Sequence, residues 1–282
     1  KRQANMTLIG TTVLQGQQGI INGTLVGDTN DLTLNFTTET AIAGDGNGIN
    51  NLTVVGPALL GANVTTLGSQ TYQSPITLSA ATVLTGTNGT FIGGLNGNEN
   101  DLTLNFEDVT TIDGNNVFSN LGNLTSHGDV NLSGTIVTEG VQTYEANMTL
   151  IGTTVLQGEQ GVINGSLIGD NNDLTLNFTT ETAIAGDGNG INNLTVVGPA
   201  LLGASVTTIG SQEYQSPVTL GAATVLTGTS GSFTGGLDGN GNDLTLHFST
   251  VTTIDGSSTF SNLGNLTSKG DVVETPLKLP PI

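Results

Sequence analysis

Carboxylates are the side chains of this sequence that are best suited to chemistry, and they recur in four short turns. The turns read GDTND, GNEND, GDNND and GNGND, and each precedes an apolar segment that begins Leu-Thr-Leu. Asp28 and Asp31 lie in the first turn, and Asp170 and Asp173 lie in the third. Carboxylate oxygens at a turn are the hard ligands that calcium prefers. These four aspartates are therefore the candidate calcium ligands of the chain.

The spacing of these turns favours a simpler interpretation. Nonapeptide calcium repeats, which the turns partly resemble, follow one another directly, so that adjacent turns share each ion. Here one such turn occurs in about 70 residues. Asn, Asp and Gly are also the ordinary residues of tight turns. We therefore expect turns that bind no metal and no other cofactor, with calcium as the alternative.

A catalytic carboxylate pair is not expected. The aspartate before each Leu-Thr-Leu segment recurs after about 70 residues. That interval corresponds to three coils of the repeat described below, or roughly 14 Å at ~4.8 Å per coil. Two carboxylates that act on one bond lie closer together. His127 and His247 do not occupy equivalent positions of the repeat. We assign no catalytic residue and expect that the protein is not an enzyme.

Basic residues are almost absent from the chain. It contains 4 Lys and Arg against 23 Asp and Glu, which gives a formal net charge of −19. The four are Lys1, Arg2, Lys269 and Lys278, so no basic residue lies between positions 3 and 268. Nucleic acids and anionic membrane surfaces attract clusters of Lys and Arg. We therefore expect no nucleic-acid partner, and we expect no membrane insertion because no apolar run is long enough.

The element that must position the carboxylates is a motif that occurs twelve times: an apolar residue, a threonine and usually a second apolar residue. The position before the threonine is always apolar, and the position after it is apolar ten times. This alternation is typical of a β-strand with one buried face. The threonines are Thr7, Thr33, Thr53, Thr77, Thr103, Thr125, Thr149, Thr175, Thr195, Thr219, Thr245 and Thr267.

The intervals between these threonines predict a solenoid. Subtracting neighbouring positions gives 26, 20, 24, 26, 22 and 24, and the same series begins again at Thr149. One short strand cannot bury its apolar face alone, whereas a coil that returns the chain to the same place stacks each strand on the previous one. We predict an all-β parallel β-helix, or β-solenoid, of about twelve coils of 20–26 residues with about three strands each.

Four blocks of about 70 residues divide the chain. Residues 1–69 and 70–141 are related, residues 142–211 repeat the first block almost letter for letter, and residues 212–270 repeat the second. We expect one continuous β-solenoid over residues 1–270. In residues 271–282 a glutamate replaces a core leucine and three prolines follow. Because proline removes ladder donors, we expect a Pro-rich cap or an arm that exchanges with a second copy.

The motif also predicts how the core is packed. The third residue after each threonine points inward by the same alternation, and in four coils it is Phe36, Phe106, Phe178 or Phe248. The other coils carry Gly or Ala at this position. We expect each phenylalanine to fill the space that small neighbours leave, because a uniform column of Phe would overpack a narrow core.

A family resemblance covers essentially the whole chain. The run VTTLGSQTYQSPITLSAATVLTGTNGTFIGGLNGNENDLTLNF at residues 64–106 and its copy at residues 206–248 carry it most clearly. They resemble the tandem repeat of large bacterial surface exoproteins of the filamentous haemagglutinin type, which combines VTT, QTY, VTLGA and LTG with a following LTL. The resemblance implies a right-handed β-helical shaft that is secreted and displayed on the bacterial cell surface. It also implies a role in adhesion, aggregation or matrix.

Two structural functions follow from this architecture. The first is a non-enzymatic extracellular protein whose β-solenoid forms a fibre or filament that supports cell-surface adhesion, matrix or biofilm. Its partner would be a second copy, joined end to end through the first and last coils and the C-terminal tail, besides the surface of a host or a neighbouring cell. The alternative is a passive shaft segment of a giant secreted adhesin.

Three other surface functions are weaker alternatives. Outward threonines suggest ice binding, but the residues two positions after them are mixed. Sequons such as those at Asn5, Asn51 and Asn193 arise from the motif itself, because Asn is a good corner residue before a strand. A carbohydrate-binding surface would need exposed aromatic rings for strong stacking. The chain has no Trp, and we expect only its three tyrosines on the surface: Tyr72, Tyr144 and Tyr214.

Overall fold

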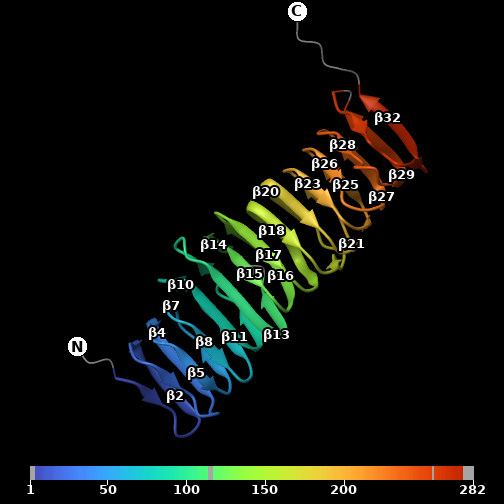
Figure 1. The fold of residues 1–282 in the computed structure, drawn as a ribbon. Coiled ribbons are helices and arrows are strands. Elements are labelled where there is room, and N and C mark those ends of the chain that lie inside the picture. The colour runs from blue at the N-terminus through green and yellow to red at the C-terminus, as the bar shows by residue number, and fades with distance from the viewer. Residues whose placement is uncertain (1–3, 114–116, 256, 276–282) are drawn as a thin grey trace, which may run out of the picture. The chain divides into compact units, whose positions relative to one another are not determined.

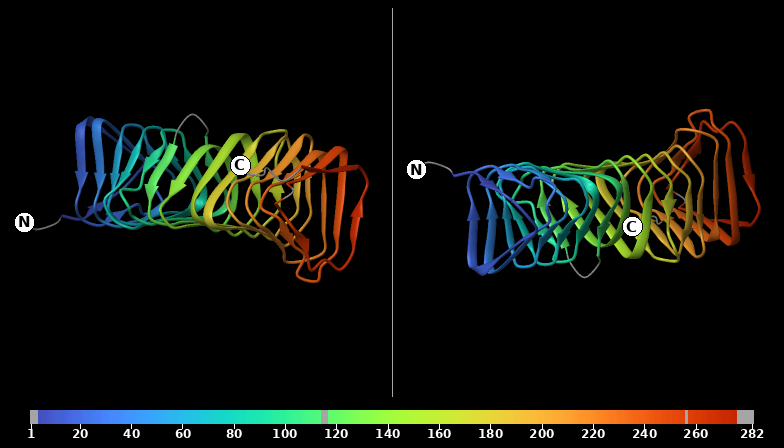
Figure 2. Two further views of the ribbon diagram at one scale, coloured as in Figure 1. Left: turned by 90° about the horizontal axis from the view of Figure 1, so that it is seen from above. Right: turned by 90° about the horizontal axis from the view of Figure 1, so that it is seen from below.

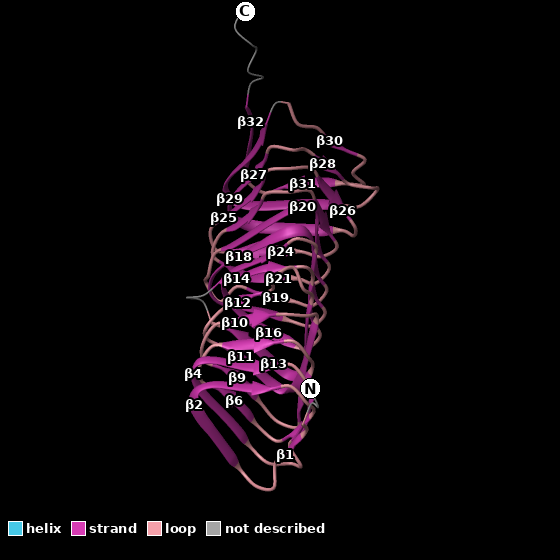
Figure 3. Ribbon diagram, turned by 90° about the vertical axis from the view of Figure 1, so that its left-hand side faces the viewer, coloured by secondary structure: helices cyan, strands magenta, loops and turns pink. Residues whose placement is uncertain are grey.

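The fold is an all-β parallel β-solenoid, as the sequence predicts, and it has about 13 turns. It is seen in a computed structural model that describes residues 4–113, 117–255 and 257–275. The described residues form strands, turns and loops without a helix, and Figure 3 shows strands joined by short loops from coil to coil. A helix that could cross a membrane is therefore absent from the described part of the chain.

Contacts divide the chain into two units, residues 1–146 and residues 147–282. The strands of the first unit are mostly short, with a few of ten or eleven residues that span two faces of a coil. They are β1 (Met6–Thr7), β2 (Thr12–Ile21), β3 (Leu25–Val26), β4 (Leu32–Ile42), β5 (Gly46–Ile49), β6 (Leu52–Val54), β7 (Ala58–Leu60), β8 (Val64–Thr66), β9 (Gln70–Tyr72), β10 (Ile76–Leu78), β11 (Thr82–Phe91), β12 (Leu95–Asn96), β13 (Leu102–Ile112), β14 (Val117–Leu121), β15 (Leu124–Ser126), β16 (Asp129–Thr138) and β17 (Val141–Tyr144).

The second unit repeats this pattern of short and long strands. They are β18 (Met148–Ile163), β19 (Leu167–Ile168), β20 (Leu174–Ile184), β21 (Gly188–Ile191), β22 (Leu194–Val196), β23 (Ala200–Leu202), β24 (Val206–Thr208), β25 (Ser211–Tyr214), β26 (Val218–Leu220), β27 (Thr224–Phe233), β28 (Leu237–Asp238), β29 (Leu244–Asp255), β30 (Phe260–Ser261), β31 (Leu266–Ser268) and β32 (Asp271–Thr275). Within each unit, Figures 1 and 2 show the strands of successive coils lying side by side.

A step of six residues sets the length of a coil. Strands β6, β7, β8, β9 and β10 begin at positions 52, 58, 64, 70 and 76. Every third strand pairs in parallel, so that Leu52 lies opposite Gln70 and Ala58 lies opposite Ile76. A coil here is therefore three strands and three such steps. Longer corners extend the coil elsewhere, as between Thr12 and Leu32 or between Leu102 and Leu124, which are also paired.

The three strands of each coil stack into three faces, which we call A, B and C. In the first unit, face A contains β1, β3, β5, β8, the first halves of β11 and β13, β15 and β17. Face B contains the first halves of β2 and β4, then β6, β9, the second halves of β11 and β13, and the first half of β16. Face C contains the second halves of β2 and β4, then β7, β10, β12, β14 and the second half of β16.

These faces correct the predicted stacking of the threonine motif. Motif threonines lie in register where their interval is a single coil, as for Thr33 with Thr53 on face B. Thr7, however, lies opposite Val26, and Thr77 lies opposite Asn96. The longer intervals are one coil plus the step to the next strand, so they carry the motif to the next face. Coils are consequently shorter than predicted, and there are about 13 of them instead of twelve.

The inward and outward alternation of the motif is confirmed. Leu32 and Leu34 are buried on either side of the half-exposed Thr33, and the same pattern recurs in β6, β10 and β22. Two members at the ends of the inward column depart from it, because Met6 of β1 is partly exposed and Leu266 of β31 is 50% exposed. The core therefore follows the period-2 pattern in the strands that have a coil on both sides.

The phenylalanines fill space left by glycines, as the sequence predicts, but the glycines next to the rings lie in the preceding long strand and are not those at the equivalent motif position. Phe36 lies opposite Gly16 across the β2–β4 ladder. A Cβ on Gly19 of the same strand would stand 2.3 Å from the Phe36 ring, closer than any real contact. Gly89, Gly161 and Gly231 meet Phe106, Phe178 and Phe248 in the same way. Each large ring is thus accommodated by the absence of a side chain on the preceding coil.

The expected surface position of the tyrosines is wrong. Tyr72, Tyr144 and Tyr214 are each only 1% exposed. The Tyr72 hydroxyl donates to Gln70 Oε1 at 2.9 Å, and Gln70 Nε2 donates to the backbone oxygens of Val64 and Thr85, both at 2.9 Å. The buried glutamine therefore satisfies the hydroxyl and is itself satisfied by the backbone. Gln, Thr and Tyr are all polar, but the alternation along β9 places Gln70 and Tyr72 inward and Thr71 outward.

Candidate functional site

The four acidic turns are tight two-residue turns. Asp28 and Thr29 both have positive φ, at 48° and 63°, and the Asn30 amide donates to the Gly27 oxygen at 3.0 Å. The pairs at 98–99, 170–171 and 240–241 have the same left-handed backbone. Asn, Asp and Gly tolerate this conformation best, which explains the composition of the turns.

In three of the four turns, an asparagine side-chain nitrogen donates to backbone oxygens that converge on it. Asn30 Nδ2 donates to the backbone oxygens of Gly27 at 3.1 Å, Asp28 at 3.0 Å and Leu8 at 3.5 Å. Asn100 and Asn172 make the equivalent three contacts. Carbonyl oxygens that converge in this way are the groups that also coordinate calcium. Here an amide donor from the chain itself holds them together.

The aspartate that ends each turn is bonded to the next coil. Asp31 Oδ1 accepts hydrogen bonds from Asn50 Nδ2 at 2.7 Å, from the Asn51 amide at 3.1 Å and from Asn51 Nδ2 at 3.0 Å. The side-chain hydrogen bond from Asn50, followed by that from Asn51, lowers the pKa of the Asp31 carboxyl below its ordinary value. Asp173 accepts the same three donors from Asn192 and Asn193. These carboxylates therefore join successive coils at a corner.

The equivalent aspartates do not share one column. Leu32, which follows Asp31, is on face B, whereas Leu102, which follows Asp101, is on face A. The predicted separation of three coils along one corner is therefore wrong, for the same reason that the threonine motif changes face. Among the described residues, no three His, Asp or Glu side chains gather as a metal site would require. Calcium at Asp28, Asp31, Asp170 and Asp173 stays a prediction.

The two histidines lie in different settings. His127 Nδ1 lies 2.6 Å from Glu145 Oε2 of the following coil, and both side chains are roughly half exposed. His247 lies opposite Thr227 in the second unit. The His127 contact thus joins two successive coils at the surface.

An in-register ladder of threonines runs along face B of the first unit. Five outward threonines lie opposite one another on consecutive coils: Thr33, Thr53, Thr71, Thr90 and Thr111. The ladder is one residue wide, because Asn35 and Val55 stand two positions after the first two threonines. In the second unit, Glu213 and Ser232 interrupt the equivalent column. Sequence reasoning missed this ladder because only two of its members belong to the motif.

Motif asparagines serve as corner residues. Asn51 Nδ2 donates to Asp31, and Asn51 Oδ1 accepts from the Ser69 amide at 2.9 Å and the Ser69 hydroxyl at 3.0 Å. Asn193 makes the same contacts with Asp173 and Ser211. A glycan on either Nδ2 would share this nitrogen with a hydrogen bond between coils.

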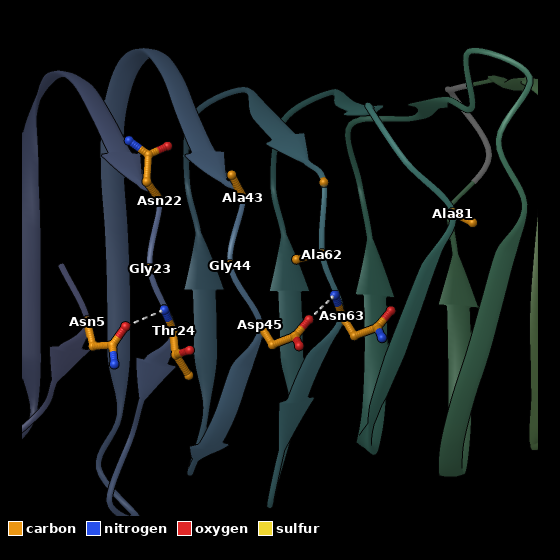
Figure 4. A pocket seen from close by; sticks show the side chains of 11 residues that line it. Asn5, Asn22, Gly23, Thr24, Ala43, Gly44, Asp45, Ala62, Asn63 and Ala81 are labelled. Atoms are coloured by element: carbon orange, nitrogen blue, oxygen red, sulfur yellow. Dashed lines mark hydrogen bonds between the residues drawn. The ribbon is translucent and has the colours of Figure 1, made fainter. Parts of the chain in front are cut away.

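A polar groove crosses successive corners of the first unit where face C passes into face A (Figure 4). Its volume is about 450 Å³. Glycine and alanine form much of its surface, and asparagine, aspartate and threonine side chains border it. The lining residues are Asn5, Asn22, Gly23, Thr24, Ala43, Gly44, Asp45, Gly61, Ala62, Asn63 and Ala81.

The border of the groove is fixed by hydrogen bonds from coil to coil. Asn5 Oδ1 accepts from the Thr24 amide at 3.1 Å, and Asp45 Oδ1 accepts from the Asn63 amide at 3.1 Å. Asn63 Oδ1 in turn accepts from the Val83 amide at 2.8 Å. One side-chain atom of each residue is thus held in place. The sequence carries no signal for this groove, because small residues at corners also occur for purely structural reasons.

The second unit has the same hydrogen-bonded border with one smaller side chain. The Ser205 amide donates to Asp187 Oδ1 at 3.1 Å, and Ser205 Oγ accepts from the Val225 amide at 3.1 Å. Ser205 therefore replaces Asn63 as the acceptor. Another hollow of this unit is apolar and small, about 80 Å³, and is lined by residues that include Ala183, Leu201 and Gly221.

Comparison with protein-family models, with curated proteins and with solved structures finds no match to the chain.

Proposed function

We propose that the chain is a non-enzymatic structural protein of the bacterial cell exterior, whose β-solenoid forms a fibre or filament that supports adhesion or a matrix. The observation that carries this proposal is the repetition of structural roles. Asp31 and Asp173 join coils in the same way, and Phe36, Phe106, Phe178 and Phe248 fill the core in the same way. A chain in which equivalent residues do equivalent structural work is suited to building length.

The outward faces suit an extended material. The ladder on face B presents short, uncharged hydroxyl side chains over five coils. The net charge of −19 keeps unspecific contacts between copies unfavourable. Association would then be directed to surfaces where backbone pairing outweighs the repulsion.

End-to-end pairing is the association that we propose. A coil stacks by parallel backbone pairing, and the coil that covers it can belong to the same chain or to a second copy. The surfaces are the first coil, with β1 and β2, and the last strands, β31 and β32. The proposed exchange arm at residues 271–282 lies partly outside the described residues, which end at position 275.

The resemblance to filamentous haemagglutinin-type exoproteins supports a surface location, a right-handed coil and a role in adhesion. It also supports the second candidate, a passive shaft segment of a giant secreted adhesin. The uniform coils favour that alternative equally, because a shaft needs length and stiffness without a site of its own. The two functions differ in whether copies associate with one another.

Electron microscopy of the 282-residue chain at neutral pH, with and without calcium, distinguishes them. The filament proposal predicts uniform fibres at micromolar concentration, and fibres that grow only with calcium would add a metal role at the acidic turns. Isolated short rods under both conditions would contradict the filament and leave the shaft as the function.

A further inference from the structure

The groove of the first unit carries polar side-chain groups that have no hydrogen-bond partner in the described part of the chain. The side chain of Asn22 makes no hydrogen bond among the described residues. In Asn5, Asp45 and Asn63 the Oδ1 atom accepts a backbone hydrogen bond, and the second polar atom (Nδ2 of each asparagine, Oδ2 of Asp45) has no partner among the described residues. Figure 4 shows these groups along the successive corners of the groove. Hydrogen bonds between coils hold Asn5, Asp45 and Asn63 in fixed positions, so these three side chains need little further ordering when a ligand binds.

The chemistry of the groove selects its ligand. An anionic chain is repelled, because the protein carries −19 and has no Lys or Arg between positions 3 and 268. An apolar ligand finds no large side chain, because the surface between the polar groups is Gly23, Gly44, Gly61 and alanines. Amide donors, an amide oxygen and a carboxylate oxygen match a ligand that both donates and accepts hydrogen bonds. Hydroxyl groups do both.

We propose that this groove binds a neutral, hydroxyl-rich polysaccharide chain that runs along the solenoid across successive coils. Asn5, Asn22 and Asn63 donate to its hydroxyl oxygens, and Asp45 Oδ2 accepts from a hydroxyl. The spacing of the groups follows the coils, at ~4.8 Å, so one linear chain meets several of them. The glycine and alanine surface allows the sugar rings to approach the backbone.

Each such contact is weak, because the groove offers hydrogen bonds without aromatic stacking. All three tyrosines are buried, and each neutral hydrogen bond contributes little against water. A polymer that engages many copies of the protein compensates for this by multivalency. The proposal does not depend on filament formation, since the groove lies within one unit.

The second unit supplies a matched control for the key asparagine. Ser205 stands where the first unit has Asn63 and accepts the same backbone hydrogen bond, from Val225. Asn63→Ser should therefore keep the border of the groove and remove only the free amide group. Asp45→Asn keeps the acceptor for the Asn63 amide and removes the charge. Asn35→Ser, an exposed change on face B, tests for unspecific effects.

Affinity electrophoresis of the full chain in native gels tests the proposal. The gels contain dextran, galactomannan or hydroxyethyl cellulose as neutral polysaccharides, and alginate as an anionic one. We expect retardation by at least one neutral polymer and none by alginate. Asn63→Ser and Asp45→Asn should each weaken it by roughly three- to tenfold, the loss of one hydrogen bond, while Asn35→Ser should not.

Three results would overturn the proposal: no retardation by any neutral polymer, retardation by alginate of equal strength, or retardation that survives both groove substitutions. Electron microscopy of the same variants tests the filament proposal separately. A variant that loses polysaccharide binding should still form the fibres that the unchanged chain forms.

Discussion

Adjacent residues of one strand have opposite roles, and Leu174 with Thr175 shows this most simply. Leu174 is 1% exposed in the core, whereas Thr175 points outward and lies opposite Thr195. Leu174→Asp should lower the free energy of unfolding by about 4 kcal/mol or more, because it places a charge in an apolar column. Thr175→Ser should change it by less than about 0.5 kcal/mol.

Guanidinium unfolding followed by circular dichroism measures both variants, with Leu174→Ala as the milder core change if the aspartate variant does not fold. Equal losses for Leu174→Asp and Thr175→Ser would contradict the inward and outward assignment.

The buried tyrosines predict a loss of stability at alkaline pH. Burial raises the pKa of Tyr72, Tyr144 and Tyr214 above the ordinary value of about 10. The unfolded chain therefore loses these protons at lower pH than the folded chain does. Their contribution to stability is complete below pH ~10 and falls as the pH rises above it.

A variant with all three tyrosines changed to phenylalanine isolates this effect. It should be less stable than the parent at pH 8, because Gln70 and its equivalents lose a donor, and its stability should depend less on pH between 8 and 11.5. Denaturant midpoints across this range provide the measurement. An unchanged alkaline slope would show that the tyrosines do not titrate with unfolding.

Single residues can be predicted from the sequence where the period-2 pattern alone decides their position. The inward leucines and the four phenylalanines fall in this class. The tyrosines do not, because their burial depends on a glutamine two residues earlier that satisfies the hydroxyl. The groove at Asn5, Asp45 and Asn63 is not predictable either, since its shape arises from five corners that are distant in the sequence.

Paired strands on adjacent coils pack well where a large side chain on one strand lies against a small residue on the other. A Cβ on Gly89 of β11 would lie 2.4 Å from the Phe106 ring of β13, whereas a Cβ on Gly10 would meet nothing within 4 Å. Gly89→Ala should therefore destabilise the fold by about 1–3 kcal/mol through overpacking. Gly10→Ala, the matched control, should be close to neutral.

A second-site change makes this prediction specific. In a Phe106→Leu background, Gly89→Ala should cost less than it does alone, because the smaller side chain leaves room for the methyl group. Thermal or denaturant unfolding of the four variants completes the cycle. Independent, additive effects would show that the two residues do not share the same space.

Strand register is only partly predictable from the sequence. The shorter motif intervals equal the true coil, as for Thr33 with Thr53 and Thr103 with Thr125. The longer intervals carry the same residue types to the next face, and composition alone does not reveal that change. The six-residue step is visible only when the three-residue strands at 58–60, 64–66 and 70–72 are also recognised.

The number of coils in the whole molecule depends on the six-residue step between successive strands. Stacking every motif on the previous one gives twelve coils, whereas the observed pairing gives about 13. The position of every outward side chain along a face changes with the register, including those of the threonine ladder and the groove. The positions of the groove and of the threonine ladder therefore depend on the strand register.

Engineered disulfides test the register most directly, because the chain has no native cysteine. Cα atoms that are paired on adjacent coils stand ~4.8 Å apart, within the range that a disulfide spans. We predict that Thr77→Cys with Asn96→Cys forms an intramolecular disulfide on mild oxidation, because these residues are partners in the structure. Thr77→Cys with Thr103→Cys, the pairing that the motif alone suggests, should stay reduced. Mass spectrometry of the two variants gives the answer, and a bridge between 77 and 103 without one between 77 and 96 would contradict the account.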